Sequence, residues 1–248
     1  MFNNLKQIFN PINTTTKWSQ TDKEETFNLN LRKYKNNKTL KFYLDNPIEY
    51  QFNNFGFRTP DDFNNVDYGN VFLGCSHTMG VGHHLENVWS YKLNQQVGGK
   101  FWNISAGGIG IMTNFRLLLA FYKDLKIKNI FHYVPKYPRY EFYVDGKFRI
   151  LNINRDDLHP ECVNLLGDLY QIELTHIPYT MAIKQLAQDI GCDYYLINDF
   201  IPSKKSISIE ARDLFHFSLN QQNQIYEKFL DKFNKKEVMN LKFEKNIL

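Results

Sequence analysis

Residues 70–80 read NVFLGCSHTMG, and this stretch decides the fold class. It begins with a short apolar run of the kind that forms a buried strand, and a glycine ends that run. A helical spacing of apolar residues follows over residues 87–97 and stops at two glycines. The stretch therefore predicts a strand over residues 70–74, a turn that carries Ser76, and a helix after the turn.

The same alternation of strand and helix patterns continues to the end of the chain. Strands that are separated by helices pair in parallel through right-handed crossovers, so helices cover both faces of the sheet. The sequence therefore predicts an α/β fold in which a mostly parallel sheet lies between helices. Further strands are expected at residues 101–105, 129–134 and 193–197, and further helices at 113–125, 177–190 and 219–233.

Two segments depart from this alternation. Residues 1–45 are rich in Asn, Lys and Thr and show little sustained periodicity, which indicates a loosely structured N-terminal arm with room for one short helix. Residues 139–172 interrupt the pattern with Asp145 and Gly146 between two alternating runs, a strong hairpin signal, and a short helix is expected after it. We expect one domain over residues 46–248 that contains this insertion.

Charge, cysteine content and hydropathy disfavour several classes of protein. The chain of 248 residues carries 30 basic and 26 acidic residues, and their dispersal disfavours a nucleic-acid surface. Three cysteines without a CxxC pair argue against a disulfide framework and favour a reducing compartment. No segment approaches the roughly 18 apolar residues of a membrane span, and the N-terminus lacks the apolar core of a signal peptide. We expect a cytoplasmic protein that binds neither nucleic acid nor membrane.

Polar residues follow the predicted strands at what should be one edge of the sheet. Functional groups gather at the carboxyl ends of parallel strands, where Ser76 and the glycines at 107–108 lie. A serine in such a turn acts as a nucleophile when a histidine takes its proton and an acid orients the histidine. An acid three residues before a histidine occurs at Asp156/His159, Glu173/His176 and Asp213/His216.

Asp213 and His216 are the favoured acid and base. They lie between the last predicted strand and the last predicted helix, from where they can reach the edge that carries Ser76. The first pair falls in the insertion, and the second falls at the start of a helix that follows no clear strand. Position in the fold thus favours a triad of Ser76, His216 and Asp213.

Three stretches resemble sequence blocks of the SGNH/GDSL hydrolases, a family of esterases, lipases and carbohydrate deacetylases. FLGCSHTMGVG resembles the first block, NISAGG at residues 103–108 the second, and DLFH at residues 213–216 the last, in the family's order over roughly residues 50–235. The resemblance implies a flavodoxin-like three-layer α/β/α fold and a reaction that needs no metal or organic cofactor. The implied site residues are the nucleophile Ser76, its partners His216 and Asp213, and an oxyanion hole formed by the N–H groups of Ser76 and Gly108.

The chain departs from that family at two points. The family's third block supplies an Asn side chain to the oxyanion hole, but the segment PKYPRYEF after the strand at 129–134 contains no Asn. Lys136, Tyr137 and Arg139 are the possible substitute donors, and the sequence does not choose among them. Cys75 stands where the first block has Asp, which should alter local hydrogen bonds without removing a catalytic role.

Several alternatives stay open beside this hypothesis. Cys75, His77, His83 and His84 suggest a metal site, but adjacent histidines with a single cysteine make a poor zinc ligand set. Ser76 taken alone is also typical of a helix cap. We expect a serine hydrolase that cleaves an acyl ester of a small molecule or carbohydrate, or one that transfers the acyl group to a sugar hydroxyl. Because the third block is missing, a binding or structural protein on the same scaffold is the competing hypothesis.

Overall fold

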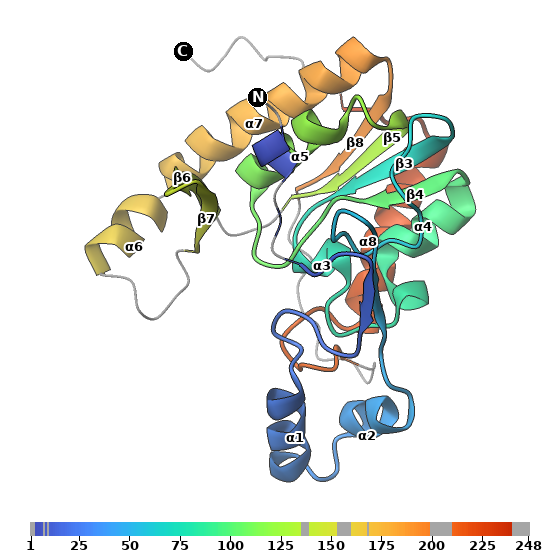
Figure 1. Cartoon of the computed structure of the whole chain (residues 1–248), viewed down its shortest axis with the longest axis vertical. Helices are drawn as coiled ribbons and strands as arrows, with labels where there is room; N and C mark the ends of the chain where they lie inside the picture. The colour runs from blue at the N-terminus through green and yellow to red at the C-terminus, as the bar shows by residue number, and fades with distance from the viewer. Residues whose placement is uncertain are drawn as a thin grey trace.

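A parallel β-sheet forms the centre of the molecule (Figure 1). Its strands are β3 (Tyr68–Leu73), β4 (Lys100–Asn103), β5 (Lys126–Tyr133) and β8 (Asp193–Ile197). Within the described part of the chain the strands lie in the order β4–β3–β5–β8, and each is parallel to its neighbours. The structure is a computed structural model that describes residues 3–6, 8, 10–134, 139–152, 160–167, 169–198 and 210–239.

Helices cover both faces of this sheet. On one face lie α4 (Trp89–Val97) and α8 (Leu219–Asn234), and on the other lie α5 (Ile111–Phe121) and α7 (Leu169–Ile190) (Figure 1). Side chains alternate along each strand, so that Phe72 packs on the α4/α8 side and its neighbours pack on the α5/α7 side. The predicted α/β class, with a parallel sheet between two layers of helices, is therefore confirmed.

The helix α7 differs most from its predicted bounds. The sequence predicts this helix over roughly residues 177–190, before the glycine at 191. The helix begins instead at Leu169 and continues through Pro178. A proline inside a helix removes one backbone hydrogen bond, and the exposed Leu174 four residues earlier shows that this turn faces solvent, where water can bind the unpaired carbonyl. The strand at 193–197 has the bounds that were predicted.

The carboxyl ends of the four strands are level. Leu73 on β3 pairs with His132 on β5, and His132 pairs with Leu196 on β8. Phe72 pairs with Asn103, the last residue of β4. The segments that follow the strands therefore leave from one edge, which is the edge predicted to carry Ser76.

The N-terminal residues contain more structure than their sequence indicates. A short strand β1 (Thr14–Thr16) pairs antiparallel with β2 (Tyr50–Phe52), and helices α1 (Glu24–Lys33) and α2 (Lys38–Asp45) follow β1. Figure 1 shows the two helices together at the lower end of the molecule. The expected arm was loosely packed, with room for one short helix.

These two helices are fixed mainly by contacts with distant residues. Phe27, Leu40 and Tyr43 share a small core with Met79 and Val81, which follow the turn of Ser76. Helices of 10 and 8 residues are shorter than the roughly 11–18 residues over which a helical period is read, so the sequence pattern missed them. The domain boundary at residue 45 stays a prediction.

The hairpin predicted at Asp145 and Gly146 is confirmed. Its strands are β6 (Arg139–Val144) and β7 (Lys147–Asn152), and both turn residues have positive φ, as a tight hairpin turn requires. The short helix α6 (Pro160–Gly167) follows, and Figure 1 shows hairpin and helix projecting beside the sheet. The remaining short elements are the 3₁₀ turns η1 (Asn3–Lys6) and η2 (Leu85–Asn87) and the helix α3 (Ser76–Met79). Among the described residues, no helix combines the length and apolar character needed to cross a membrane.

The aromatic stack in the sheet should carry much of the stability. Phe131 is fully buried between Phe72 and Tyr195, with ring centroids 5.3 and 5.1 Å away. We expect Phe131→Ala to lower the free energy of unfolding by about 3–5 kcal/mol because it leaves a cavity that the stacked rings cannot fill. Urea titration measures this, and Phe142→Ala at an exposed position should change the value by about 0.5 kcal/mol or less. Equal effects of the two substitutions would contradict the packing described.

Candidate active site

Ser76 lies on a tight turn between β3 and α3. The backbone turns at Gly74, where an added Cβ atom would lie 2.0 Å from Oγ1 of Thr78 and 2.9 Å from the carbonyl oxygen of Tyr133, so only glycine fits. Ser76 is the first residue of α3, and the cap position before it belongs to Cys75, whose side chain makes no cap hydrogen bond. The hydroxyl of Ser76 has no hydrogen-bond partner within the described residues. The hydroxyl therefore does not cap the helix, and it makes no hydrogen bond to the described residues that would hold it away from a substrate.

Asp213 and His216 form a compact acid–base pair. Nδ1 of His216 lies 2.7 Å from Oδ2 of Asp213, and both side chains are almost completely buried. The other carboxylate oxygen accepts the backbone N–H groups of Phe215 and His216, at 3.0 and 3.1 Å. Leu214 between them has φ of +57°, which the tight loop imposes. An ionised carboxylate only accepts hydrogen bonds, so Nδ1 of His216 carries a proton, and Nε2 is the nitrogen left to accept one when the ring is neutral.

The charge of Asp213 is stabilised by its donors. Burial pushes the pKa of the Asp213 carboxyl upward, but the hydrogen bond and charge of His216, with further bonds from Thr21 and Phe215, hold it below its usual range. The acid is therefore ionised at neutral pH. That is the state in which it can orient an imidazole and favour its protonation.

The loop with this pair is fixed to the segment that follows Ser76. The N–H of Arg212 donates to the carbonyl of Gly82 at 2.8 Å, and Nε2 of His83 lies 2.5 Å from the carbonyl oxygen of Phe217. The ring of His77, the residue after Ser76, lies against His216 at a centroid distance of 5.1 Å. The predicted base thus lies beside the predicted nucleophile turn.

Of the other two acid–histidine pairs, Asp156 and His159 lie outside the described residues. His176 lies on α7, where it lines a small cavity with Val134, Thr180 and Leu196, and none of the three predicted triad residues lines that cavity. The Glu173/His176 pair therefore does not share a cavity with the turn of Ser76, although it has the same three-residue spacing as Asp213 and His216.

The loop after β4 carries Gly108, the predicted oxyanion donor. Gly108 has φ of +78°, an added Cβ atom would meet nothing within 4 Å, and its N–H has no partner within the described residues. The loop is tied to α3 because the side-chain amide of Asn103 donates to the carbonyl of Thr78 at 3.1 Å and its oxygen accepts the N–H of Ser105 at 3.2 Å. The loop that carries Gly108 is thus tied at Asn103 to α3.

Among the substitute donors, only Arg139 can be placed. Lys136 and Tyr137 lie outside the described residues. Arg139 begins β6 and donates from Nη1 to the carbonyl of Ile109 at 3.1 Å, while its Nε is buried without a partner within the described part of the chain. Its guanidinium therefore lies against the loop that carries Gly108.

His77 and its neighbours do not form a metal site among the described residues, where no three His, Cys, Asp or Glu side chains gather around one point. The His77 ring stacks on Phe217 at 3.6 Å, and its Nδ1 is buried with no partner within those residues. Burial, followed by the charges of His216 and Arg139, lowers the pKa of His77 well below its usual range. His77 is a neutral packing residue beside the predicted base.

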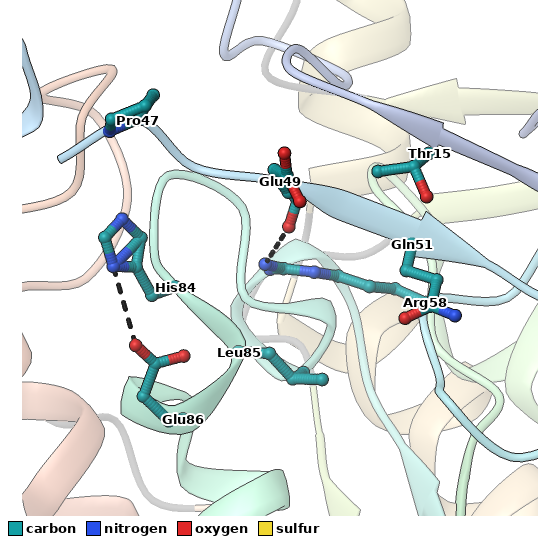
Figure 2. Close-up of a pocket in the computed structure, with 8 residues that line it drawn as sticks. All are labelled: Thr15, Pro47, Glu49, Gln51, Arg58, His84, Leu85 and Glu86. Atoms are coloured by element: carbon teal, nitrogen blue, oxygen red, sulfur yellow. Dashed lines mark hydrogen bonds and ion pairs between the residues drawn. The ribbon is translucent and has the colours of Figure 1, made fainter.

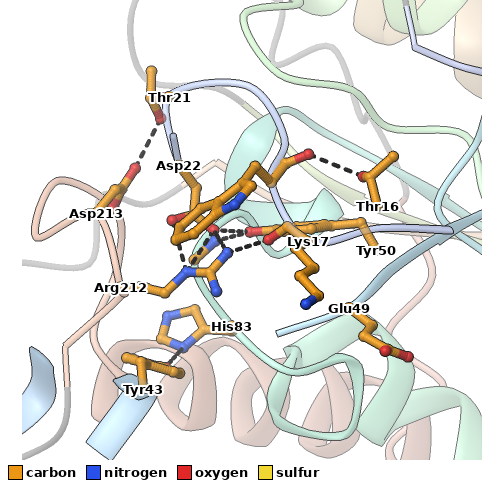
Figure 3. Close-up of polar contacts among 12 residues, drawn as sticks. Thr16, Lys17, Thr21, Asp22, Tyr43, Glu49, Tyr50, His83, Arg212 and Asp213 are labelled. Atoms are coloured by element: carbon orange, nitrogen blue, oxygen red, sulfur yellow. Dashed lines mark hydrogen bonds and ion pairs between the residues drawn. The ribbon is translucent and has the colours of Figure 1, made fainter. Parts of the chain in front are cut away.

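Sequence reasoning missed a polar cluster from the N-terminal residues. The carboxylate of Asp22 binds the guanidinium of Arg212, the residue before Asp213, and the hydroxyl of Thr21 donates to Oδ2 of Asp213 at 2.8 Å (Figure 3). These contacts join residues that lie about 190 positions apart. No fixed spacing in the sequence could have revealed them.

Ser76 lines none of five cavities in the described part of the chain. One, of about 340 Å³, is polar and lies around the buried Arg58 (Figure 2). Arg58 donates to the carbonyls of Gly80 and His83 at 2.6 and 2.8 Å. A second, of about 530 Å³, is open and lies beside Asp213, between α1 and the exposed Phe215. The residues that line the first are Thr15, Pro47, Glu49, Gln51, Arg58, His84, Leu85 and Glu86.

Comparisons with known proteins add solved structures of low similarity. No protein-family model matches the sequence, and no curated protein matches it. A protein of the G-D-S-L lipolytic family from Desulfitobacterium hafniense DCB-2 is 14% identical, with a TM-score of 0.35 over 68% of this chain and 74% of that one. The acetyl xylan esterase Est2A from the rumen bacterium Butyrivibrio proteoclasticus is 11% identical, with a TM-score of 0.38 over 70% and 65%. A carbohydrate esterase with divergent catalytic and non-catalytic binding functions is 10% identical, with a TM-score of 0.36 over 71% and 67%.

All three TM-scores lie below 0.5, so the functional interpretation rests on the residues of the site.

Two buried histidines predict how stability depends on pH. Burial lowers the pKa of His83 to about 4 and that of His132 to about 3. Between pH 6.5 and 4 the unfolded chain therefore binds protons at these residues that the folded chain does not, so the free energy of unfolding falls as the pH falls. Each histidine should contribute a slope of about 1.4 kcal/mol per pH unit.

Urea titration at pH 7, 6 and 5 measures this slope. His132 uses both ring nitrogens, one with the hydroxyl of Tyr194 at 2.9 Å and one with Oδ1 of Asn114 at 3.2 Å. His132→Gln should remove one histidine's share of the slope. A slope that this substitution leaves unchanged would contradict the neutral, buried state of His132.

Proposed function

We propose that the protein is a serine hydrolase that cleaves an acyl ester through Ser76, His216 and Asp213. The observation that carries the proposal is the 2.7 Å contact between Nδ1 of His216 and the buried carboxylate of Asp213, in a loop fixed beside the turn of Ser76. Such a contact fixes the tautomer in which Nε2 can take a proton. The uncommitted hydroxyl of Ser76 is the group from which the proton would come.

The reaction has two halves. Nε2 of His216 takes the proton of the Ser76 hydroxyl as Oγ attacks the acyl carbonyl carbon, and the resulting tetrahedral oxyanion collapses to an acyl-serine. The departing alkoxide takes the proton back from Nε2 and leaves as an alcohol. Water then attacks the acyl group and gives its proton to Nε2. Collapse of the second tetrahedral oxyanion breaks the bond to Oγ, which regains the proton, and the carboxylic acid leaves.

The oxyanion would be bound by the N–H groups of Ser76 and Gly108, both of which lack a partner within the described residues. Arg139 is the candidate for the donor that a family Asn would supply, because its guanidinium lies on the loop of Gly108. A cation near developing negative charge stabilises the transition state more than the neutral ester. Under this proposal Arg139 replaces the amide of the third block.

The substrate class follows from the sequence resemblance: an acyl ester of a small molecule or of a carbohydrate. If a sugar hydroxyl replaces water in the second half, the same residues perform acyl transfer. Product analysis distinguishes the two, because hydrolysis releases a free acid and transfer gives a new ester.

Ser76→Ala is the direct test of the nucleophile. We expect a fluorophosphonate probe to label the wild-type protein and not this variant, because only an activated serine reacts. Hydrolysis of short p-nitrophenyl esters should fall by at least about 10⁴-fold in Ser76→Ala and in His216→Gln. Mass spectrometry of the labelled peptide and a spectrophotometric ester assay measure the two effects.

Cys75→Ala is the matched control, because Cys75 is the adjacent residue and is also buried. It should keep both labelling and turnover. Loss of labelling in Cys75→Ala with retention in Ser76→Ala would assign the nucleophile to the thiol. A wild-type protein that neither labels nor hydrolyses esters would favour a binding protein on the same scaffold.

The role of Arg139 is tested separately. Arg139→Met keeps the length of the side chain and removes its donors, so we expect kcat for a p-nitrophenyl ester to fall by about 10²–10³, the usual effect of losing one oxyanion donor. Circular dichroism and urea titration show whether the hairpin and fold persist. An unchanged kcat in a folded variant would remove Arg139 from the site.

A further inference from the structure

A turn from the N-terminal residues reaches the candidate active site at two places. Residues Ser19–Asp22 form this turn, which two backbone hydrogen bonds of 3.0 and 3.1 Å between Ser19 and Asp22 close. Its two central residues, Gln20 and Thr21, contact different parts of the site. The turn lies outside the parallel sheet and belongs to the segment that the sequence indicated as a loose arm.

Thr21 contacts the acid of the proposed triad. Its hydroxyl donates to Oδ2 of Asp213 at 2.8 Å, the same oxygen that accepts Nδ1 of His216 at 2.7 Å. With the two backbone donors on Oδ1, the carboxylate accepts four hydrogen bonds. Four donors in different directions leave the carboxylate one orientation, and they favour its charged form.

Gln20 contacts the loop that carries the proposed oxyanion donor. A Cβ atom on Gly107 would lie 2.6 Å from the side-chain amide of Gln20, so the amide packs directly on the residue before Gly108. Nε2 of Gln20 is itself held by Oδ1 of Asn10 at 2.5 Å. The turn is thus wedged between the acid of the triad and the glycine loop.

A buried ion pair holds the turn in that position. The carboxylate of Asp22 accepts Nε of Arg212 at 2.9 Å and Nη2 at 2.6 Å, and both side chains are almost fully buried. The hydroxyl of Tyr50 donates to Asp22 at 2.5 Å and accepts the N–H of Gly82 at 2.8 Å (Figure 3). Arg212 is covalently bound to Asp213, and Gly82 lies six residues after Ser76. The turn, the acid loop and the nucleophile segment are therefore joined in one network.

We propose that the turn Ser19–Asp22 is part of the catalytic site, and that Thr21 is a positioning residue that fixes the carboxylate of Asp213 and, through it, the imidazole of His216. The proposal rests on the proposed function of Ser76, His216 and Asp213. Thr21 touches neither the substrate nor the reacting atoms. Its role is to hold Oδ2 where the imidazole needs it.

A catalytic effect can be separated from a structural one because Thr21 itself is exposed. Replacing the side chain of an exposed residue should change the free energy of unfolding little, whereas the bond that the hydroxyl of Thr21 makes is on a side chain that is only 2% exposed. Thr21→Val removes the donor and keeps the shape of the side chain. Thr21→Ser keeps the donor and removes the methyl group.

The experiment compares Thr21→Val, Thr21→Ser and the control Thr26→Val. Thr26 lies on α1 and, like Thr21, lines the open cavity beside Asp213. We expect kcat for a p-nitrophenyl ester to fall about tenfold in Thr21→Val with KM unchanged, and to stay at the wild-type value in the other two. The rate of fluorophosphonate labelling of Ser76 should fall in parallel. The low-field proton resonance of Nδ1–H of His216, observed by NMR, should shift or broaden in Thr21→Val alone.

Each outcome decides the proposal. Wild-type rates together with an unchanged His216 resonance in Thr21→Val overturn it, as does an equal loss of rate in Thr26→Val. A wild-type protein without labelling or turnover contradicts the proposed function. In that case the Nδ1–H resonance of His216 still tests the contact of Thr21. A shift of the resonance in Thr21→Val supports the positioning contact, and no shift overturns it.

Discussion

The buried ion pair between Asp22 and Arg212 is the contact on which the arrangement of the site depends. Its two side chains are 1% and 2% exposed, so both charges have lost their hydration. A buried pair of this kind adds little net stability compared with apolar residues of the same size, because desolvation offsets the attraction. A lone charge in that position would be very costly, so the pair favours the docking position of the N-terminal turn in which both charges are paired. The cation also stacks on the ring of Trp18 at 4.0 Å, which fixes the plane of the guanidinium.

Much of the fold could be predicted because the sheet is buried on both faces. Strands such as β8 are continuous apolar runs, and helices such as α8 have one apolar stripe, so their periods differ clearly. The N-terminal helices, of 10 and 8 residues, are shorter than the roughly 11–18 residues over which such a period is read. In α1, only Phe27 is buried, and the contacts that fix the segment are polar and long-range. Periodicity reports which side chains face a core, and it cannot report an ion pair between residues 190 positions apart.

In the site, too, the residues fixed by local contacts were predicted from the sequence, and those fixed by distant contacts were missed. The acid and base of the proposed triad were found from a spacing of three residues because the loop itself makes that spacing useful: Oδ1 of Asp213 binds N–H groups two and three residues later. The turn of Ser76 was found because Gly74 marks a backbone bend that excludes any side chain. Thr21 and Gln20 were missed because nothing near them in the sequence relates them to residues 213 or 107. The sequence narrowed the substitute for the missing Asn only to the segment PKYPRYEF. The direction of a side-chain donor there depends on the hairpin β6–β7, which the sequence does not place relative to the site.

Hydrogen bonds, more than proximity in the sequence, favour His216 as the base. His77 is adjacent to Ser76 and is the first histidine that a sequence argument meets, yet burial and neighbouring charge keep it neutral, and no acid binds it within the described residues. His83 and His132 use both ring nitrogens for bonds to the protein. His216 is the one described histidine with a hydrogen bond to a carboxylate, and that bond takes Nδ1 and leaves Nε2 to accept a proton. An imidazole that must gain and lose a proton in each cycle needs a fixed negative partner on one side and an uncommitted nitrogen on the other, and the carboxylate of Asp213 serves as that partner only while its own orientation is held.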